Sequence, residues 1–116
     1  MLNDPRSHGL WERTAPSAPD TAVLEGDLSA DVVVIGAGFT GVSAALHLAE
    51  TGVDVAVLEA VEIGYGGSGR NVGLVNAGMW VMPDELPRVL GAEYGNRLLT
   101  QLGDGPSLAF SLIEKH

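Results

Sequence analysis

The sequence contains no cysteine among its 116 residues. This absence excludes a disulfide framework, a thiolate metal site and a cysteine nucleophile. The three histidines are scattered along the chain, and no pair of them has the spacing of metal ligands. We therefore expect no metal site.

Basic residues are also scarce: six lysines and arginines stand against 15 aspartates and glutamates, which gives a formal net charge of −9. A nucleic-acid-binding protein would need a basic face, and anionic lipid would repel an acidic surface. The chain has no apolar run near the ~18 residues of a membrane span, and its N-terminus lacks the pattern of a secretory signal. These absences favour a cytoplasmic protein whose partner is a small molecule or another protein, with no nucleic acid and no membrane involved.

The sequence does have the hydrophobic content of a globular domain, 46% of its residues. Its apolar pattern predicts a strand, a turn, a helix and a second strand, in this order. Residues 32–35 read VVVI, a continuous apolar run typical of a strand buried on both faces of a parallel sheet. From Phe39 onward apolar residues recur every three or four positions, which predicts a helix that ends at Gly52. The alternating valines of residues 53–58 predict a second strand. The sequence therefore predicts an α/β fold with one right-handed βαβ unit, an incomplete Rossmann-like unit followed by helices.

The segments that flank this unit are less regular. Residues 1–30 hold three of the six prolines, and we expect an extended arm there. Residues 79–116 form a helical segment, in which Asp104 is predicted to cap a final helix with Pro106 in its first turn. Two strands and a few helices cannot cover a parallel sheet on both faces. We therefore expect the chain to be the leading part of a longer polypeptide, with a βαβ core and the glycine-rich sequence after it in residues 31–78.

The turn between the first strand and the helix reads GAGFTG. Its first glycine allows a tight turn, its second lets a pyrophosphate approach the backbone, and its third lets the helix pack close to the strand. The first N–H groups and the positive dipole end of the helix would then face the phosphates. The predicted cofactor-binding residues of this turn are Gly36, Ala37, Gly38, Phe39, Thr40 and Gly41.

Glu59 follows Gly36 by 23 residues and stands at the tip of the second predicted strand. At that place a carboxylate accepts the hydroxyl groups of an adenosine ribose, and we include the adjacent Ala60 in the predicted site. A carboxylate excludes the 2′-phosphate of NADP, but it suits the ribose of NAD as well as that of FAD.

A second glycine-rich stretch, GYGGSGRNVG, occupies residues 64–73. Glycines alone would predict a flexible loop, whereas an arginine and small polar side chains among them indicate a backbone that closely approaches an anion. The guanidinium group of Arg70 offers a fork of donors to phosphate oxygens. The residues of the turn, Glu59 and this stretch leave both FAD and NAD open.

These stretches together resemble a known family. Residues 31–60 are similar to the N-terminal FAD-binding segment of flavoprotein oxidoreductases of the D-amino-acid oxidase and glycine oxidase type. The second stretch resembles the family's G-x-G-A-S-G-R-N-G-G, most closely in the branch that contains gamma-glutamylputrescine oxidoreductase. The sequence departs from this pattern at Gly67, where alanine is usual, and at Val72, where glycine is usual. A β-branched residue such as Val72 does not easily take a positive φ.

The resemblance implies the FAD-binding portion of a larger two-domain flavoprotein that oxidises the C–N bond of an amine or amino acid. In that reaction a hydride passes to flavin N5, and water hydrolyses the resulting imine. By position, the resemblance implies that Ser68, Arg70 and Asn71 lie along the pyrophosphate and ribityl chain. Gly69 and Gly73 would allow the close approach of the backbone. It supplies no catalytic residue, because the substrate-binding segments of such proteins come from later sequence, and we expect this chain alone to be inactive.

Two other interpretations compete with an FAD half-site. The first is a NAD-binding Rossmann module, which the βαβ unit and Glu59 would also suit, although a nicotinamide-binding domain has no use for the second glycine-rich stretch. The second is a non-catalytic fragment or interaction protein that keeps only the beginning of the fold. His47 lies off the apolar side of the predicted helix, and we interpret it as a solvated side chain rather than a base.

Overall fold

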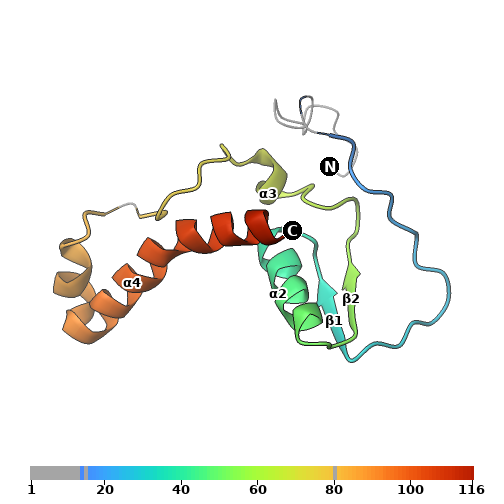
Figure 1. Ribbon diagram of the computed structural model, residues 1–116, viewed down its shortest axis with the longest axis horizontal. Coiled ribbons are helices and arrows are strands. Elements are labelled where there is room, and N and C mark those ends of the chain that lie inside the picture. The colour runs from blue at the N-terminus through green and yellow to red at the C-terminus, as the bar shows by residue number, and fades with distance from the viewer. Residues whose placement is uncertain (1–13, 15, 80) are drawn as a thin grey trace. The chain divides into compact units, whose positions relative to one another are not determined.

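The structure is a computed structural model that describes residue 14, residues 16–79 and residues 81–116. The chain divides into two compact units, Met1–Val72 and Gly73–His116. Figure 1 labels the elements, which follow one another along the chain in this order: β1 (Val32–Ile35), α2 (Phe39–Glu50), β2 (Val55–Leu58), the short helix α3 (Gly67–Arg70) and α4 (Glu85–Lys115).

The first unit is built around a parallel βαβ arrangement. Strands β1 and β2 pair in parallel, with Val32 opposite Val55 at the start of the ladder. Helix α2 connects the two strands and packs on both of them (Figure 1). Gly52 has a φ of +85°, the left-handed conformation predicted for the residue that ends this helix, and its N–H donates to the carbonyl of Ala49 at 2.9 Å. The predicted order of strand, helix and strand is therefore confirmed.

Gly41 is the point at which α2 comes closest to β1. A Cβ atom placed on Gly41 would lie 1.9 Å from the carbonyl oxygen of Gly36 and 3.2 Å from Cγ1 of Val34. The first of these separations is far shorter than any van der Waals contact. Helix and strand can approach this closely because residue 41 has no side chain, which is the role that the sequence predicted for it.

Much of the apolar surface of the βαβ arrangement remains exposed. Val33 and Ile35 of β1 are 51% and 87% exposed, whereas Ala37 and Ala45 are buried. The prediction that the first strand is buried on both faces is therefore wrong for this structure. Among the described elements only α2 packs on the sheet, so the side chains that alternate to the other face of β1 have no cover.

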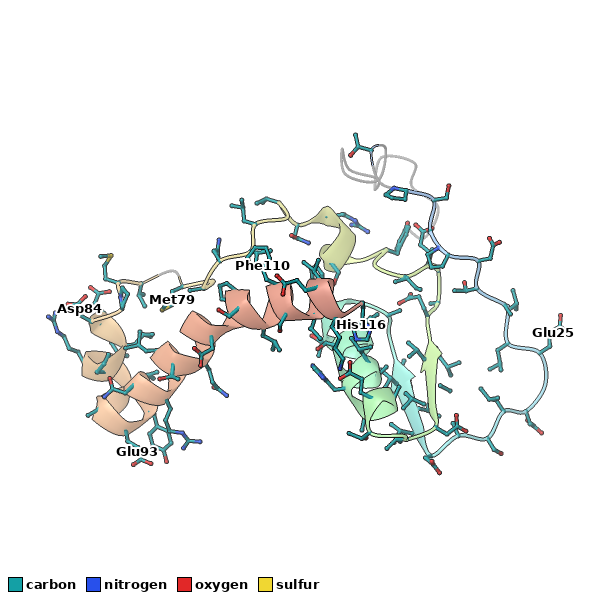
Figure 2. All side chains as sticks on the ribbon, in the orientation of Figure 1. Glu25, Met79, Asp84, Glu93, Phe110 and His116 are labelled. Atoms are coloured by element: carbon teal, nitrogen blue, oxygen red, sulfur yellow. The ribbon has the colours of Figure 1, made fainter. Side chains whose placement is uncertain are left out.

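Residues 16–30 contain no helix or strand and are almost entirely exposed. Glu25 projects away from this part of the chain (Figure 2). The rest of the predicted arm, residues 1–13 and residue 15, lies outside the described residues.

The second unit consists mainly of α4, which is broken at Gly91, where φ is 79° and ψ is 160°. The sequence placed the break at Asp104 with Pro106 after it, and this was wrong, because the helix continues through both residues. Gly91 takes a positive φ without steric cost, whereas Pro106 removes only one N–H donor from the helix. Phe110 of α4 is 54% exposed and projects from the helix (Figure 2). Neither α4 nor any other described helix is both long and apolar enough to cross a membrane.

Exchange of Gly41 for alanine tests the close approach of α2 to β1. In an ordinary helix this exchange stabilises the protein by up to about 1 kcal/mol, because glycine is a poor helix former. Here the added methyl group would collide with the Gly36 carbonyl, and overpacking of this kind costs roughly 1–3 kcal/mol. We expect a lower midpoint of thermal unfolding by circular dichroism for Gly41→Ala, and little change for Ser43→Ala at an exposed position of the same helix. A raised midpoint for Gly41→Ala would contradict the contact.

Candidate nucleotide-binding site

The candidate site lies at the carboxyl ends of β1 and β2, where the chain turns from β1 into α2. Gly36 extends the parallel ladder by one bond, since its N–H donates to the carbonyl of Leu58 at 2.7 Å. Its φ is +99°, and no atom lies within 4 Å of a Cβ atom built on it. Glycine is therefore required here by the backbone conformation, and the space beside it stays open. Because parallel strands end at the same edge of a sheet, this turn and Glu59 are neighbours.

Glu59 joins the tip of β2 to the turn. Its Oε2 accepts the N–H of Ala37 at 2.8 Å. Its Oε1 accepts the N–H groups of Ala60 at 2.8 Å and of Val61 at 3.2 Å. A carboxylate has about four lone-pair positions, so Oε2 retains one position for a further donor such as a ribose hydroxyl.

The same backbone bonds determine the charge of Glu59. The bond from Ala37 contributes most, followed by those from Val61 and Ala60, and desolvation acts in the opposite direction. Hydrogen bonds to the ionised form favour it, so the pKa of Glu59 lies below its ordinary value of 4.5. Glu59 is therefore ionised at neutral pH.

The amino end of α2 offers donors for an anion. Its first turn carries no acidic side chain, and Gly38, at the N-cap, provides no side-chain cap. Within the described part of the chain, the N–H groups of Gly38, Thr40 and Gly41 have no hydrogen-bond acceptor, as is usual at the start of a helix. Such N–H groups, together with the positive end of the helix dipole, form a binding place for phosphate.

The second glycine-rich stretch is attached to this turn by two hydrogen bonds, one from Gly64 and one through Ser68 of α3. The N–H of Gly64 donates to the carbonyl of Ala37 at 2.9 Å, and the N–H of Phe39 donates to Oγ of Ser68, also at 2.9 Å. A Cβ atom on Gly38 would lie only 2.9 Å from this Oγ. The missing side chain of Gly38 therefore makes room for Ser68. The structure thus brings the two glycine-rich stretches of the sequence together at one place.

The remaining residues of the second stretch mostly bond within it. The N–H of Gly69 donates to the carbonyl of Gly64 at 2.8 Å, and a Cβ atom on Gly69 would lie 2.5 Å from that oxygen. The side-chain amide of Asn71 donates to the carbonyl of Ser68. Gly69 and Asn71 therefore shape the turn that presents Ser68.

The side chain of Arg70 contacts Tyr65 in two ways. Nη2 of Arg70 donates to the carbonyl of Tyr65 at 2.8 Å, and its guanidinium carbon lies 5.3 Å from the centre of the Tyr65 ring. Sequence reasoning did not single out Tyr65.

Gly73, with a φ of 73°, begins the second compact unit. Val72 does not take a positive φ, which belongs among the described residues to glycines alone, so valine is tolerated at this position.

A partly open groove of about 800 Å³ borders the Glu59 side of the turn. Residues 21–24, one side of α2, strand β2 and residues 59–63 line it, and most of these side chains are apolar. The volume lies in the range of small-molecule sites, roughly 300–1,000 Å³. The groove nevertheless continues along α2 as far as Ala49, beyond the turn. Only its end at Ala37 and Glu59 belongs to the candidate site.

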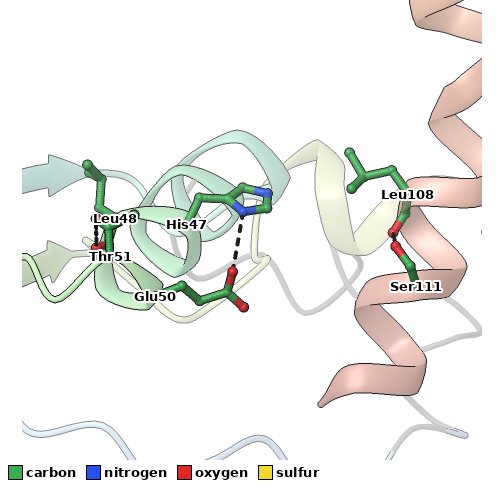
Figure 3. A network of polar contacts seen from close by, with 6 residues as sticks. All are labelled: His47, Leu48, Glu50, Thr51, Leu108 and Ser111. Carbon is green, nitrogen blue, oxygen red and sulfur yellow. Dashed lines mark hydrogen bonds and ion pairs between the residues drawn. The ribbon is translucent and has the colours of Figure 1, made fainter.

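His47 is exposed, as predicted, and its Nδ1 lies 3.7 Å from Oε2 of Glu50 (Figure 3). Figure 3 also shows two bonds within single helical segments, from the Thr51 hydroxyl to the Leu48 carbonyl and from the Ser111 hydroxyl to the Leu108 carbonyl. The described residues contain no group of three or more histidines, aspartates and glutamates that could hold a metal ion.

Comparison with protein families finds a match over residues 31–112 to the family described as FAD dependent oxidoreductase. The matched region includes β1, α2, β2, α3 and most of α4. No solved structure matches the chain.

Three relatives illustrate the similarity. The chain is 38% identical over 109 residues to the probable oxidoreductase OrdL of Rhizobium meliloti (strain 1021). The aligned region covers 94% of this chain and 26% of that protein. It is 60% identical over 55 residues to the gamma-glutamylputrescine oxidoreductase of Escherichia coli (strain K12), covering 47% of this chain and 13% of that protein. It is 41% identical over 87 residues to the probable oxidoreductase OrdL of Haemophilus influenzae, covering 75% of this chain and 20% of that protein. The chain thus spans about a quarter, or less, of the length of these relatives.

The bond between Glu59 and Ala37 is testable through its pH dependence. Because the pKa of Glu59 is lowered in the folded chain, the carboxylate stabilises the turn at pH values above the ordinary glutamate range, and this contribution is lost as the pH falls through the lowered pKa. We expect the NMR shift of the Ala37 amide proton to titrate with a midpoint below 4.5. Glu59→Gln should abolish this titration and Glu62→Gln should leave it intact. A midpoint at or above 4.5 in the unaltered chain would show that the bond does not hold the carboxylate.

Proposed function

Because the chain belongs to the FAD-dependent oxidoreductase family, we propose that it forms the FAD-binding portion of an enzyme that oxidises an amine or amino acid. The cofactor of this family is FAD, which decides against the NAD-binding alternative. The proposed substrate class is supported by the 60% identity with a segment of gamma-glutamylputrescine oxidoreductase. When bound, FAD would supply the hydride acceptor for the oxidation of the C–N bond, and the residues of this chain would hold the cofactor.

The observation that carries this proposal is the convergence of three groups on one turn. The amino end of α2 presents N–H groups, Glu59 presents an ionised carboxylate, and the second glycine-rich stretch is bonded to the turn at Ala37 and Phe39. A dinucleotide needs donors for its pyrophosphate and an acceptor for its ribose, and the turn offers both within a few residues.

We assign the parts of the cofactor accordingly. The N–H groups of Gly38, Thr40 and Gly41 would bind the pyrophosphate, and the remaining lone-pair position on Oε2 of Glu59 would accept a ribose hydroxyl. Ser68, which already accepts the N–H of Phe39, retains its own hydroxyl proton to donate to a phosphate oxygen. Arg70 would supply the positive charge that the pyrophosphate requires.

The proposal extends to the whole enzyme, of which this chain would be a part. A two-domain flavoprotein would supply the substrate-binding residues from sequence outside this chain, in line with the share of the OrdL relatives that the chain covers. We assign no catalytic residue, and on its own we expect the chain to bind FAD without turnover. A cytoplasmic location and a small-molecule amine or amino-acid substrate complete the proposal.

A titration with FAD tests the proposed function. We expect the purified protein, freed of flavin, to quench the fluorescence of added FAD on binding. Glu59→Gln replaces one carboxylate oxygen by an NH₂ group, which donates and cannot accept. The single remaining oxygen cannot serve all the backbone N–H groups and the ribose, so FAD should bind severalfold more weakly. Glu62→Gln makes the same change of charge three residues away and should bind like the unaltered protein. If the unaltered protein binds neither FAD nor ADP, the non-catalytic alternative is favoured and the proposal fails.

A further inference from the structure

Positive charge is almost absent from the part of the chain that holds the candidate site. Arg70 is the only lysine or arginine between residues 14 and 87. Residues 14–72 contain eight carboxylates, at Asp20, Glu25, Asp27, Asp31, Glu50, Asp54, Glu59 and Glu62. The doubly charged pyrophosphate of FAD would therefore meet a strongly acidic surface, in which the placement of one guanidinium group matters more than it would in a basic protein.

Arg70 stands on an element that is attached to the turn. It is the last residue of α3, two positions after Ser68, whose hydroxyl accepts the N–H of Phe39 at the amino end of α2. The backbone that carries the guanidinium group is thus fixed to the turn, but the side chain is exposed and has several rotatable bonds. An exposed arginine loses considerable rotamer entropy when it binds an anion, unless another group already holds it.

Tyr65 restrains the side chain of Arg70 in this way. The guanidinium carbon of Arg70 lies 5.3 Å from the centre of the Tyr65 ring, and Nη2 donates to the Tyr65 carbonyl at 2.8 Å. The ring occupies one face of the guanidinium group and the carbonyl takes one of its five N–H donors. The other donors remain available to an anion.

We propose that Tyr65 is a positioning residue, which holds the Arg70 guanidinium group in one orientation for the pyrophosphate of FAD. This inference rests on the proposed function. Tyr65 acts through Arg70 and contributes no contact of its own to the cofactor. A second pair of this kind among the described residues is formed by Tyr94 and Arg97 on α4, where the guanidinium carbon lies 6.0 Å from the ring centre. This pair serves as a matched control.

The test is a calorimetric titration with ADP, which carries the adenosine and the pyrophosphate but no flavin, and with adenosine. We expect Tyr65→Leu to weaken ADP binding about two- to fivefold, the range of an exposed cation–π contact. Tyr65→Phe keeps the ring and should bind ADP like the unaltered protein, as should Tyr94→Leu. Adenosine binding should not change in any of these variants, because adenosine has no phosphate.

A comparison of Tyr65→Leu in the unaltered protein and in the Arg70→Gln variant distinguishes a positioning role of Tyr65 from a merely structural one. If Tyr65 acts through Arg70, then Tyr65→Leu has no further effect on ADP affinity in Arg70→Gln, and both single variants lose part of the salt dependence of ADP binding. An equal loss in both backgrounds would assign Tyr65 a structural role and overturn the inference. Tighter ADP binding in Tyr65→Leu would show that the ring withholds the guanidinium group from the anion, and unchanged binding would show that the ring does not position it; both overturn the inference. Either result leaves the proposed function intact, whereas failure of the unaltered protein to bind FAD or ADP overturns both.

Discussion

The hydrogen bond from the Ala37 N–H to the Glu59 carboxylate is the interaction on which the candidate site depends. It connects residues 22 positions apart in the sequence, and it fixes the turn after β1 against the tip of β2. The strand ladder brings these two ends to the same edge, and this bond sets the direction of the carboxylate together with the bonds from the N–H groups of Ala60 and Val61. The lowered pKa of Glu59 and its remaining acceptor position both follow from these three bonds.

The second glycine-rich stretch adds what the βαβ unit lacks. The turn supplies N–H groups and an acid, but the surrounding residues supply almost no positive charge. Helix α3, bonded to the turn through Ser68, brings the one arginine of this region onto the same framework. A short helix of four residues would not be stable alone, so its attachment to the turn also explains why it is formed.

The sequence predicted the helices and strands that depend on the pattern of neighbouring residues. The valine run, the spacing of apolar residues after Phe39 and the left-handed Gly52 identify β1, α2 and β2 because strand and helix periods are properties of neighbouring residues. The bond between Phe39 and Ser68 spans 29 residues and the stacking of Tyr65 on Arg70 depends on how α3 folds, so neither could be found from spacing. The break in α4 was misplaced because Asp104 resembles a cap, whereas nothing local marks Gly91 as the glycine that takes a positive φ.

Ala37 has every one of its groups engaged: its N–H binds Glu59, its carbonyl accepts from Gly64, and its side chain is only 2% exposed. Such a residue cannot relax in one direction without releasing another partner. A shift of Ala37 would therefore disturb the bond to Glu59 and the bond from Gly64 together. The two attachments differ in kind, because the first depends on the side chain of Glu59 and the second only on the backbone of Gly64.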